Sequence, residues 1–175
     1  SSEAILGTSM KSVGEAMAIG RNFKESLQKA LVSLEIGFSG LDRILHLNKY
    51  ELEKNLKKNI PNKILLVAEA IRKKIHIKKI QSLSKIDAWF LEQIKEIVEV
   101  ENKIKKHGLP KNYNEFNKIK SLGFSDKKLS EITKIPEEIV RKKRTILKVL
   151  PVYKKVDTCA AEFKSFTPYM YSTYQ

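Results

Sequence analysis

Apolar residues recur every three to four positions over most of the chain, which is the period of an amphipathic α-helix. Residues 48–148 follow this pattern throughout and are predicted to form a series of helices joined by short turns. An earlier stretch with the same period follows Asn22, a predicted helix N-cap, and ends near Gly37. The predicted fold class is therefore mainly α and multihelical.

The longest predicted helix begins at a capping box formed by Ser84 and Asp87 and stops at Gly108. Most of its apolar residues share one stripe: Ile86, Trp89, Phe90, Ile94, Ile97, Val98, Val100 and Ile104. Burial of eight such side chains contributes about 12–24 kcal/mol before conformational entropy is subtracted. We expect this helix to be the spine of the core, with Phe90 inside the core and Trp89 at its edge against a flanking segment or a neighbouring molecule.

Shorter helices are predicted on both sides of this spine. Asn48 is expected to cap one of them, and Pro61 suits the first turn of the next, where its missing N–H costs nothing. Beyond the spine, Ser125 is expected to cap a second short helix and Pro136 to begin a third. In that third helix the residues predicted to point inward are Ile139, Val140 and Ile146.

Short strand-like segments are predicted at both ends of the chain. Residues 16–19 form a short apolar run next to Gly20, and residues 152–156 alternate between apolar and polar side chains. An unpartnered strand exposes backbone N–H and C=O groups. We therefore expect the two segments to pair with each other or with a second copy of the chain.

Charge is the most unusual feature of the composition. Lys and Arg number 34 against 20 Asp and Glu, a formal net charge of +14. This excess raises the hypothesis of a free-standing basic DNA-binding protein that uses a helix-turn-helix over residues 125–144. However, 29 of the cations are Lys, whereas base recognition favours the forked guanidinium of Arg. Glu137 and Glu138 would also face the phosphates, so we expect no specific nucleic-acid partner.

Candidate catalytic and metal-binding residues do not converge in the sequence. The three histidines, His46, His76 and His107, lie about 30 residues apart with no metal-ligand spacing. The only cysteine, Cys159, is expected to be a buried structural thiol in a reducing compartment. The paired carboxylates Glu99 with Glu101 and Glu137 with Glu138 need no catalytic role, since the second pair favours a helix N-terminus. We assign no catalytic, cofactor-binding or metal-binding residue.

The sequence also lacks a phosphate-binding glycine loop, an apolar run long enough to span a membrane, and a signal-peptide pattern. We therefore expect no membrane partner and a cytoplasmic protein.

Three strings resemble one enzyme family. Residues 9–21 (SMKSVGEAMAIGR) resemble the end of the first ATP-grasp unit in the large subunit of carbamoyl-phosphate synthase, apart from Ala16, where the family usually has valine. Residues 86–94 (IDAWFLEQI) resemble that subunit's central helical domain. Residues 151–163 (PVYKKVDTCAAEF) with 169–174 (YMYSTY) resemble the junction into its second half.

The resemblance implies a division of the chain into three parts. Residues 1–37 would end the first ATP-grasp (carboxyphosphate) unit, and residues 38–150 would form the helical connection or oligomerisation domain. This domain can split into subdomains 38–108 and 109–150. Residues 151–175 would form the junction into the second ATP-grasp unit.

The resemblance also implies a function for the parent enzyme, an ATP-dependent ligase. Such an enzyme makes carbamoyl phosphate from bicarbonate, glutamine-derived ammonia and two ATP, for pyrimidine and arginine synthesis. The implied partners are the two ATP-grasp halves, a glutaminase small subunit and other large subunits. ATP and Mg²⁺ or Mn²⁺ would bind in the ATP-grasp halves, whose ligand motifs have no counterpart here, so the segment alone is expected to be inactive.

Overall fold

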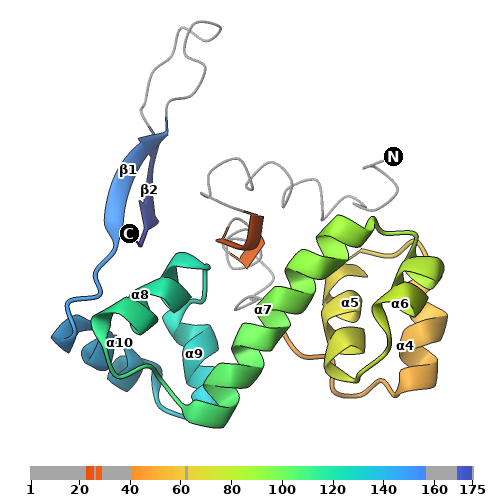
Figure 1. The fold of residues 1–175 in the computed structure, drawn as a ribbon, viewed down its shortest axis with the longest axis horizontal. Coiled ribbons are helices and arrows are strands. Elements are labelled where there is room, and N and C mark those ends of the chain that lie inside the picture. The colour runs from red at the N-terminus through yellow and green to blue at the C-terminus, as the bar shows by residue number, and fades with distance from the viewer. Residues whose placement is uncertain (1–22, 26, 29–40, 62, 157–168, 175) are drawn as a thin grey trace, which may run out of the picture.

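The computed structural model describes residues 23–25, 27, 28, 41–61, 63–156 and 169–174, with the backbone alone for 153–156 and 169–173. Within these ranges the fold is mainly α, as predicted (Figure 1). The helices are α4 (Lys49–Leu56), α5 (Lys63–Arg72), α6 (Ile77–Ser84), α7 (Ala88–His107), α8 (Tyr113–Ser121), α9 (Asp126–Thr133) and α10 (Glu137–Ile146). The strands are β1 (Val152–Val156) and β2 (Tyr169–Thr173).

Helix α7 is the spine of this arrangement, as the sequence predicted. It runs between two groups of helices, α4 to α6 on one side and α8 to α10 on the other (Figure 1). Asp87 caps its start by accepting a hydrogen bond from the Trp89 N–H at 2.8 Å, and Gly108, with φ of +81°, ends it. Its buried apolar residues are Leu91, Ile94, Ile97, Val98 and Ile104. Leu91 is fully buried although it was absent from the predicted stripe.

The predicted capping box at the start of α7 is wrong in one member. Ser84 is the last residue of α6, and its hydroxyl accepts a hydrogen bond from the Ile86 N–H at 3.2 Å. Lys85 takes the left-handed conformation, with φ of +61°, and so ends α6 immediately after Ser84. Asp87 therefore caps α7 without Ser84.

Of the two aromatic residues at the start of α7, Trp89 lies at the edge as expected, whereas Phe90, expected inside the core, is only partly buried. Trp89 is 52% exposed and meets the ring of Phe23 edge-on, with centroids 5.1 Å apart. Phe90 is partly buried against the core, and its ring centroid lies 5.2 Å from that of Phe23. Phe23 belongs to a helical stretch of the N-terminal flank, so Trp89 packs at the edge against a flanking segment, as predicted.

Two of the predicted helix N-caps on either side of α7 are confirmed. Asn48 accepts a hydrogen bond from Glu51 N–H at 2.8 Å and caps α4, and Ser125 accepts one from Lys128 N–H at 3.0 Å and caps α9. Pro61, in contrast, lies in the turn before α5, outside its predicted place in the first helical turn.

The inward face of α10 differs from the prediction. Val140 is fully buried, but Ile139 is 40% exposed and Ile146 is 72% exposed. Helix α10 lies at the edge of its group and packs mainly on α9, so only one stripe of its surface is covered. Since successive residues turn by about 100°, Ile139 and Ile146 fall about 100–120° away from Val140.

The C-terminal part of the chain forms a two-stranded antiparallel hairpin. Val152 pairs with Thr173 and Val156 with Tyr169, which confirms the strand predicted over 152–156. Its partner β2 was not predicted. The strand expected over 16–19 lies outside the described residues, as does its pairing. The division at residues 37 and 150 remains a prediction.

Candidate functional site

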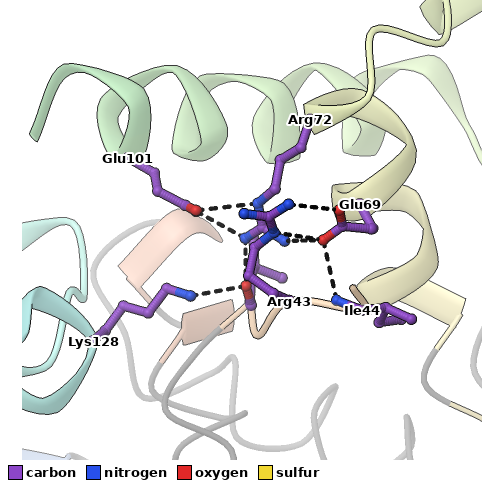
Figure 2. Close-up of polar contacts among 7 residues, drawn as sticks. Arg43, Ile44, Glu69, Arg72, Glu101 and Lys128 are labelled. Atoms are coloured by element: carbon purple, nitrogen blue, oxygen red, sulfur yellow. Dashed lines mark hydrogen bonds and ion pairs between the residues drawn. The ribbon is translucent and has the colours of Figure 1, made fainter. Parts of the chain in front are cut away.

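A network of charged side chains lies where the two groups of helices meet α7, and it begins at Glu69 (Figure 2). Glu69 lies in the apolar segment of α5 and is fully buried. Arg43 donates to both of its carboxylate oxygens, from Nε to Oε1 at 2.7 Å and from Nη2 to Oε2 at 3.0 Å. The backbone N–H of Ile44 donates to Oε1 at 3.1 Å. The carboxylate therefore fixes the segment that precedes α4 against α5.

Arg72 connects this carboxylate to α7. It lies three residues after Glu69 on α5, and its Nη1 donates to Glu69 Oε1 at 3.3 Å. Its other nitrogens form a bidentate pair with Glu101 of α7, with Nε–Oε1 at 3.1 Å and Nη2–Oε2 at 2.8 Å. The side chains of Arg72 and Glu101 are 4% and 9% exposed. Two parallel hydrogen bonds between charged groups set the orientation of α5 on α7.

Lys128 brings α9 into the same network. Its side chain is almost fully buried, and its Nζ donates to the Leu41 carbonyl oxygen at 3.1 Å. The same oxygen accepts a hydrogen bond from Arg72 Nη2. The network therefore joins α5, α7, α9 and the segment 41–44, which are far apart in the sequence (Figure 2).

The electrostatics of the network follow from burial and from these partners. Burial alone would raise the pKa of Glu69, but the hydrogen bonds from Arg43 and Ile44 and the charges of Arg43 and Arg72 lower it below its usual value. The hydrogen bond to Glu69 raises the pKa of Arg43. Burial lowers the pKa of Lys128, against the attraction of Glu101. Glu69 is thus ionised at neutral pH and holds its cations.

The chemistry of this network is structural. The carboxylate oxygens of Glu69 and Glu101 are occupied by guanidinium groups, which do not release protons in the physiological range. Breaking one buried pair would leave an uncompensated charge, at a cost of about 3–5 kcal/mol. The arrangement therefore fixes helix positions and offers no acid or base to a substrate.

The three histidines are placed separately. His76 caps α6, and its Nδ1 accepts a hydrogen bond from the Lys78 N–H at 3.1 Å. His46 precedes α4 and His107 ends α7, and both are exposed. Across the parts of the chain that the structure describes, no three His, Cys, Asp or Glu side chains are grouped to hold a metal ion.

The carboxylates singled out in the sequence have different positions. Glu99 is exposed on α7, while Glu101 belongs to the network. Glu137 and Glu138 are exposed in the first turn of α10, as expected for charges near a helix N-terminus. Cys159 lies outside the described residues.

Sequence analysis did not find this network: it named Glu101 only as half of a carboxylate pair, and it did not single out Arg43, Glu69, Arg72 or Lys128. One signal was present, because Glu69 interrupts an otherwise apolar run and Arg72 follows it at helical spacing. A charge inside an apolar run indicates a buried partner.

The segment 125–144 forms a helix pair, and Arg144 at its basic end is held by an acidic partner. Lys134, with φ of +61°, ends α9, and α10 then packs on α9. Arg144 donates from Nε to Asp126 at 3.0 Å and forms an ion pair through Nη2 at 2.9 Å. This arginine stabilises the helix pair and is not presented to a phosphate backbone.

A shallow cavity of about 610 Å³ lies apart from the network, between the C-terminal half of α7 and α8. Its lining includes the apolar residues Val100, Ile104 and Leu122 and the cationic residues Lys103 and Lys118. Among the described helices, none is long and apolar enough to cross a membrane.

Comparison with known proteins gives a consistent result. A family model described as the oligomerisation domain of the carbamoyl-phosphate synthetase large chain matches residues 15–148. The carbamoyl phosphate synthase large chain of Brucella melitensis is 48% identical over 183 residues, which cover 99% of this chain and 16% of that protein. The Pseudomonas aeruginosa large chain is 47% identical over 178 residues, covering 99% of this chain and 17% of that one.

A plant protein matches equally well. The arginine-specific large chain of Arabidopsis thaliana, which is chloroplastic, is 47% identical over 178 residues, covering 99% of this chain and 15% of that protein. The chain therefore spans between 15% and 17% of the length of these three relatives. These relatives give no support to the DNA-binding hypothesis.

Proposed function

Because the chain belongs to the oligomerisation-domain family of carbamoyl-phosphate synthetase large chains, we propose that it connects and positions the catalytic units of such a large chain. The high identity over almost the whole chain supports this assignment. In this proposal residues 1–37 end the first ATP-grasp unit, residues 38–150 form the connecting domain, and residues 151–175 lead into the second unit.

The observation that supports this role best is the buried network around Glu69 and Arg72. A connector that keeps two units in register must resist bending between its own parts. The network ties α5, α7 and α9 through hydrogen bonds between residues 26 to 87 positions apart in the sequence. Hydrogen bonds over such separations make the helices one body.

The activity belongs to the whole large chain in this proposal. The parent enzyme is an ATP-dependent ligase that makes carbamoyl phosphate from bicarbonate, glutamine-derived ammonia and two ATP. Its product feeds pyrimidine and arginine synthesis, in keeping with the printed name of the Arabidopsis relative. A glutaminase small subunit supplies the ammonia. The cytoplasmic location expected from the sequence stays a prediction.

ATP and Mg²⁺ or Mn²⁺ are assigned to the ATP-grasp halves of the parent. The described residues do not fit a divalent cation, because the buried carboxylates Glu69 and Glu101 are already bound to guanidinium groups. We therefore expect the purified chain to hydrolyse no ATP. A steady release of phosphate from ATP by this chain, at a rate that follows its concentration, would contradict the assignment.

The partner proposed for this domain is another large chain. Sedimentation velocity or light scattering over micromolar to millimolar concentrations should show a dimer or larger species. Association that survives raised salt would indicate a specific interface, since screening removes contacts between exposed charges. A monomer over the whole range would overturn self-association through this segment.

A further inference from the structure

The turn between α8 and α9, together with the helix ends beside it (residues 120–126), contacts the N-terminal flank of the chain. Gly123 has φ of +96°, and a Cβ at this position would lie 2.9 Å from the carbonyl oxygen of Glu25 and 3.0 Å from its Cα. Gln28 Nε2 donates to the Leu122 carbonyl oxygen at 3.0 Å. The side chains of Glu25 and Gln28 are both buried. The helical residues 23–25, 27 and 28 therefore rest on this turn, with the backbone of Glu25 against that of Gly123.

The same turn contacts the C-terminal flank through a cluster of charges. Asp126 accepts hydrogen bonds from Lys120 Nζ and from Arg144 Nε, each at 3.0 Å. The side chains of Lys120 and Arg144 are only 6% and 11% exposed. The ring of Tyr174, one residue after β2, has its centroid 5.1 Å from Lys120 Nζ and 5.9 Å from Arg144 Cζ.

These distances place the Tyr174 ring within the range of a cation–π interaction with both cations. Burial would raise the pKa of Asp126, but the hydrogen bond from Arg144 and the nearby charge of Lys120 lower it. Asp126 is therefore ionised at neutral pH and holds the two cations beside the ring. The end of the hairpin is fixed to the helical body at this point.

The two contacts are mechanically connected. The Gly123 N–H donates to the Lys120 carbonyl oxygen at 3.0 Å, so the residue that touches Glu25 is bonded to the residue that touches Tyr174. Only three positions separate them. We therefore expect a shift of Gly123 away from the N-terminal flank to be transmitted through this hydrogen bond to the end of α8, on which Lys120 lies.

We propose that the α8–α9 turn is an interaction surface shared by both flanks of the chain, so that docking of Glu25 and Gln28 and docking of Tyr174 stabilise each other. If the proposed function holds, these flanks lead to the two ATP-grasp halves, and the turn would communicate between them. The proposed coupling does not itself depend on that function, because both contacts lie within this chain.

The first test removes the C-terminal contact and measures the N-terminal one. Tyr174→Leu keeps an apolar side chain but removes the aromatic ring, and hydrogen exchange is followed at the amides of residues 23–28. We expect protection there to fall by about fivefold, at the lower end of measured couplings between sites. Tyr50→Leu is the matched control, because Tyr50 is 72% exposed on α4, away from the turn.

The second test runs in the opposite direction. Gly123→Ala places a methyl group against Glu25, and exchange is followed in β2, residues 169–173, where protection should again fall about fivefold. Gly108→Ala is the matched control, since Gly108 also has a positive φ of +81° but a Cβ there would have no atom within 4 Å. An effect of backbone strain alone would therefore appear in both variants. An effect of losing the contact with Glu25 would appear only in Gly123→Ala.

The amides of α5 serve as the internal reference for global unfolding. The proposal is overturned if Tyr174→Leu and Gly123→Ala both leave the exchange protection of the remote flank within twofold of wild type. It is also overturned if that protection changes only in parallel with the protection of α5. It also fails if Gly108→Ala has the same effect on β2 as Gly123→Ala. A chain that is monomeric yet shows the coupling would contradict the proposed self-association and leave this inference standing.

Discussion

The network around Glu69 and the cluster around Asp126 each hold a carboxylate between cationic side chains, but at different depths. The side chain of Glu69 has no exposed surface, whereas that of Asp126 is 14% exposed. The first joins α5 to parts of the helical body, namely the segment 41–44, α7 and α9 (Figure 2). The second contacts α8 and α10 and lies beside Tyr174 of the flank.

This difference separates two roles of the same chemistry. Removing a fully buried ion from its partners leaves a charge with no water to replace them. A cluster near the surface loses less, because water reaches the groups that remain. The inner network therefore fixes the body of the domain, while the outer cluster provides an attachment that can be weakened without unfolding it.

The largest effect is expected at Glu69. Glu69→Ala leaves the side chains of Arg43 and Arg72 without their shared carboxylate, and we expect the free energy of unfolding to fall by about 3–5 kcal/mol. Urea denaturation followed by circular dichroism measures this change. Glu92→Ala, at an exposed position of α7, is the control and should stay within about 0.5 kcal/mol of wild type. If Glu69→Ala lowered the free energy of unfolding by less than about 1 kcal/mol, the Glu69 network would contribute no more to stability than the cluster around Asp126.

A smaller effect is expected at Asp126. Asp126→Asn keeps the shape of the side chain but removes the charge that faces Lys120 and Arg144, and we expect a loss of about 1.5–3 kcal/mol at neutral pH. Urea denaturation at several pH values measures both this loss and its pH dependence.

The pH dependence at Asp126 has a definite sign. Its pKa in the folded protein is lowered from an ordinary value of about 3.9, so its stabilising contribution is complete above that value and is lost as the pH falls through the folded pKa. Asp126→Asn should therefore lose less stability than wild type on acidification from neutral pH. Equal losses in the two proteins would show that Asp126 is not the titrating group.

Much of the fold was predictable from the sequence because the signals were local. Asn48 and Ser125 cap helices through hydrogen bonds to residues three positions away, and the stripe on α7 repeats within one helix. The network was not predictable in this way. Arg43 and Glu69 are 26 positions apart, and Arg72 and Glu101 are 29 apart, so their pairing depends on how the helices pack.

The same reason explains the wrong prediction for α10. Periodicity identified an apolar stripe but not how many neighbours the helix would have. Helix α10 packs mainly on α9, so Val140 is covered while Ile146 is not. The role as a connector came from the resemblance of the strings at 9–21, 86–94 and 151–174, since neither charge nor spacing indicated it.

A substitution at Lys128 changes one of the cations of the inner network, and we expect it to have a small effect on the free energy of unfolding. Lys128→Met removes a buried charge, while the Leu41 carbonyl oxygen keeps its hydrogen bond from Arg72. The hydrogen-bond partner that Lys128 loses is an uncharged carbonyl that keeps its other donor, so this substitution breaks no hydrogen-bonded ion pair, and we expect a change within about 1 kcal/mol at neutral pH. Lys127→Met, at the exposed neighbouring position, is the control.

The pH dependence at Lys128 is opposite to that at Asp126. Burial lowers the pKa of Lys128 from an ordinary value of about 10.4, so the unfolded chain binds more protons than the folded one between the two values. Wild type should therefore gain stability relative to Lys128→Met as the pH rises through this window. A difference that stays constant with pH would mean that Lys128 is not held in an environment that disfavours its charge.

The smallest effect is expected on the outer face of α10, the helix that provides Arg144 to the cluster. Ile146 is 72% exposed, so Ile146→Ala should change the free energy of unfolding by less than about 0.5 kcal/mol. Val140→Ala, on the buried face of the same helix, removes two buried carbons and should cost about 1–2 kcal/mol. Urea denaturation of the two variants compares the faces directly. A larger loss at Ile146 than at Val140 would place the covered face of α10 on the side of Ile139 and Ile146, which the sequence pattern had predicted to point inward together with Val140.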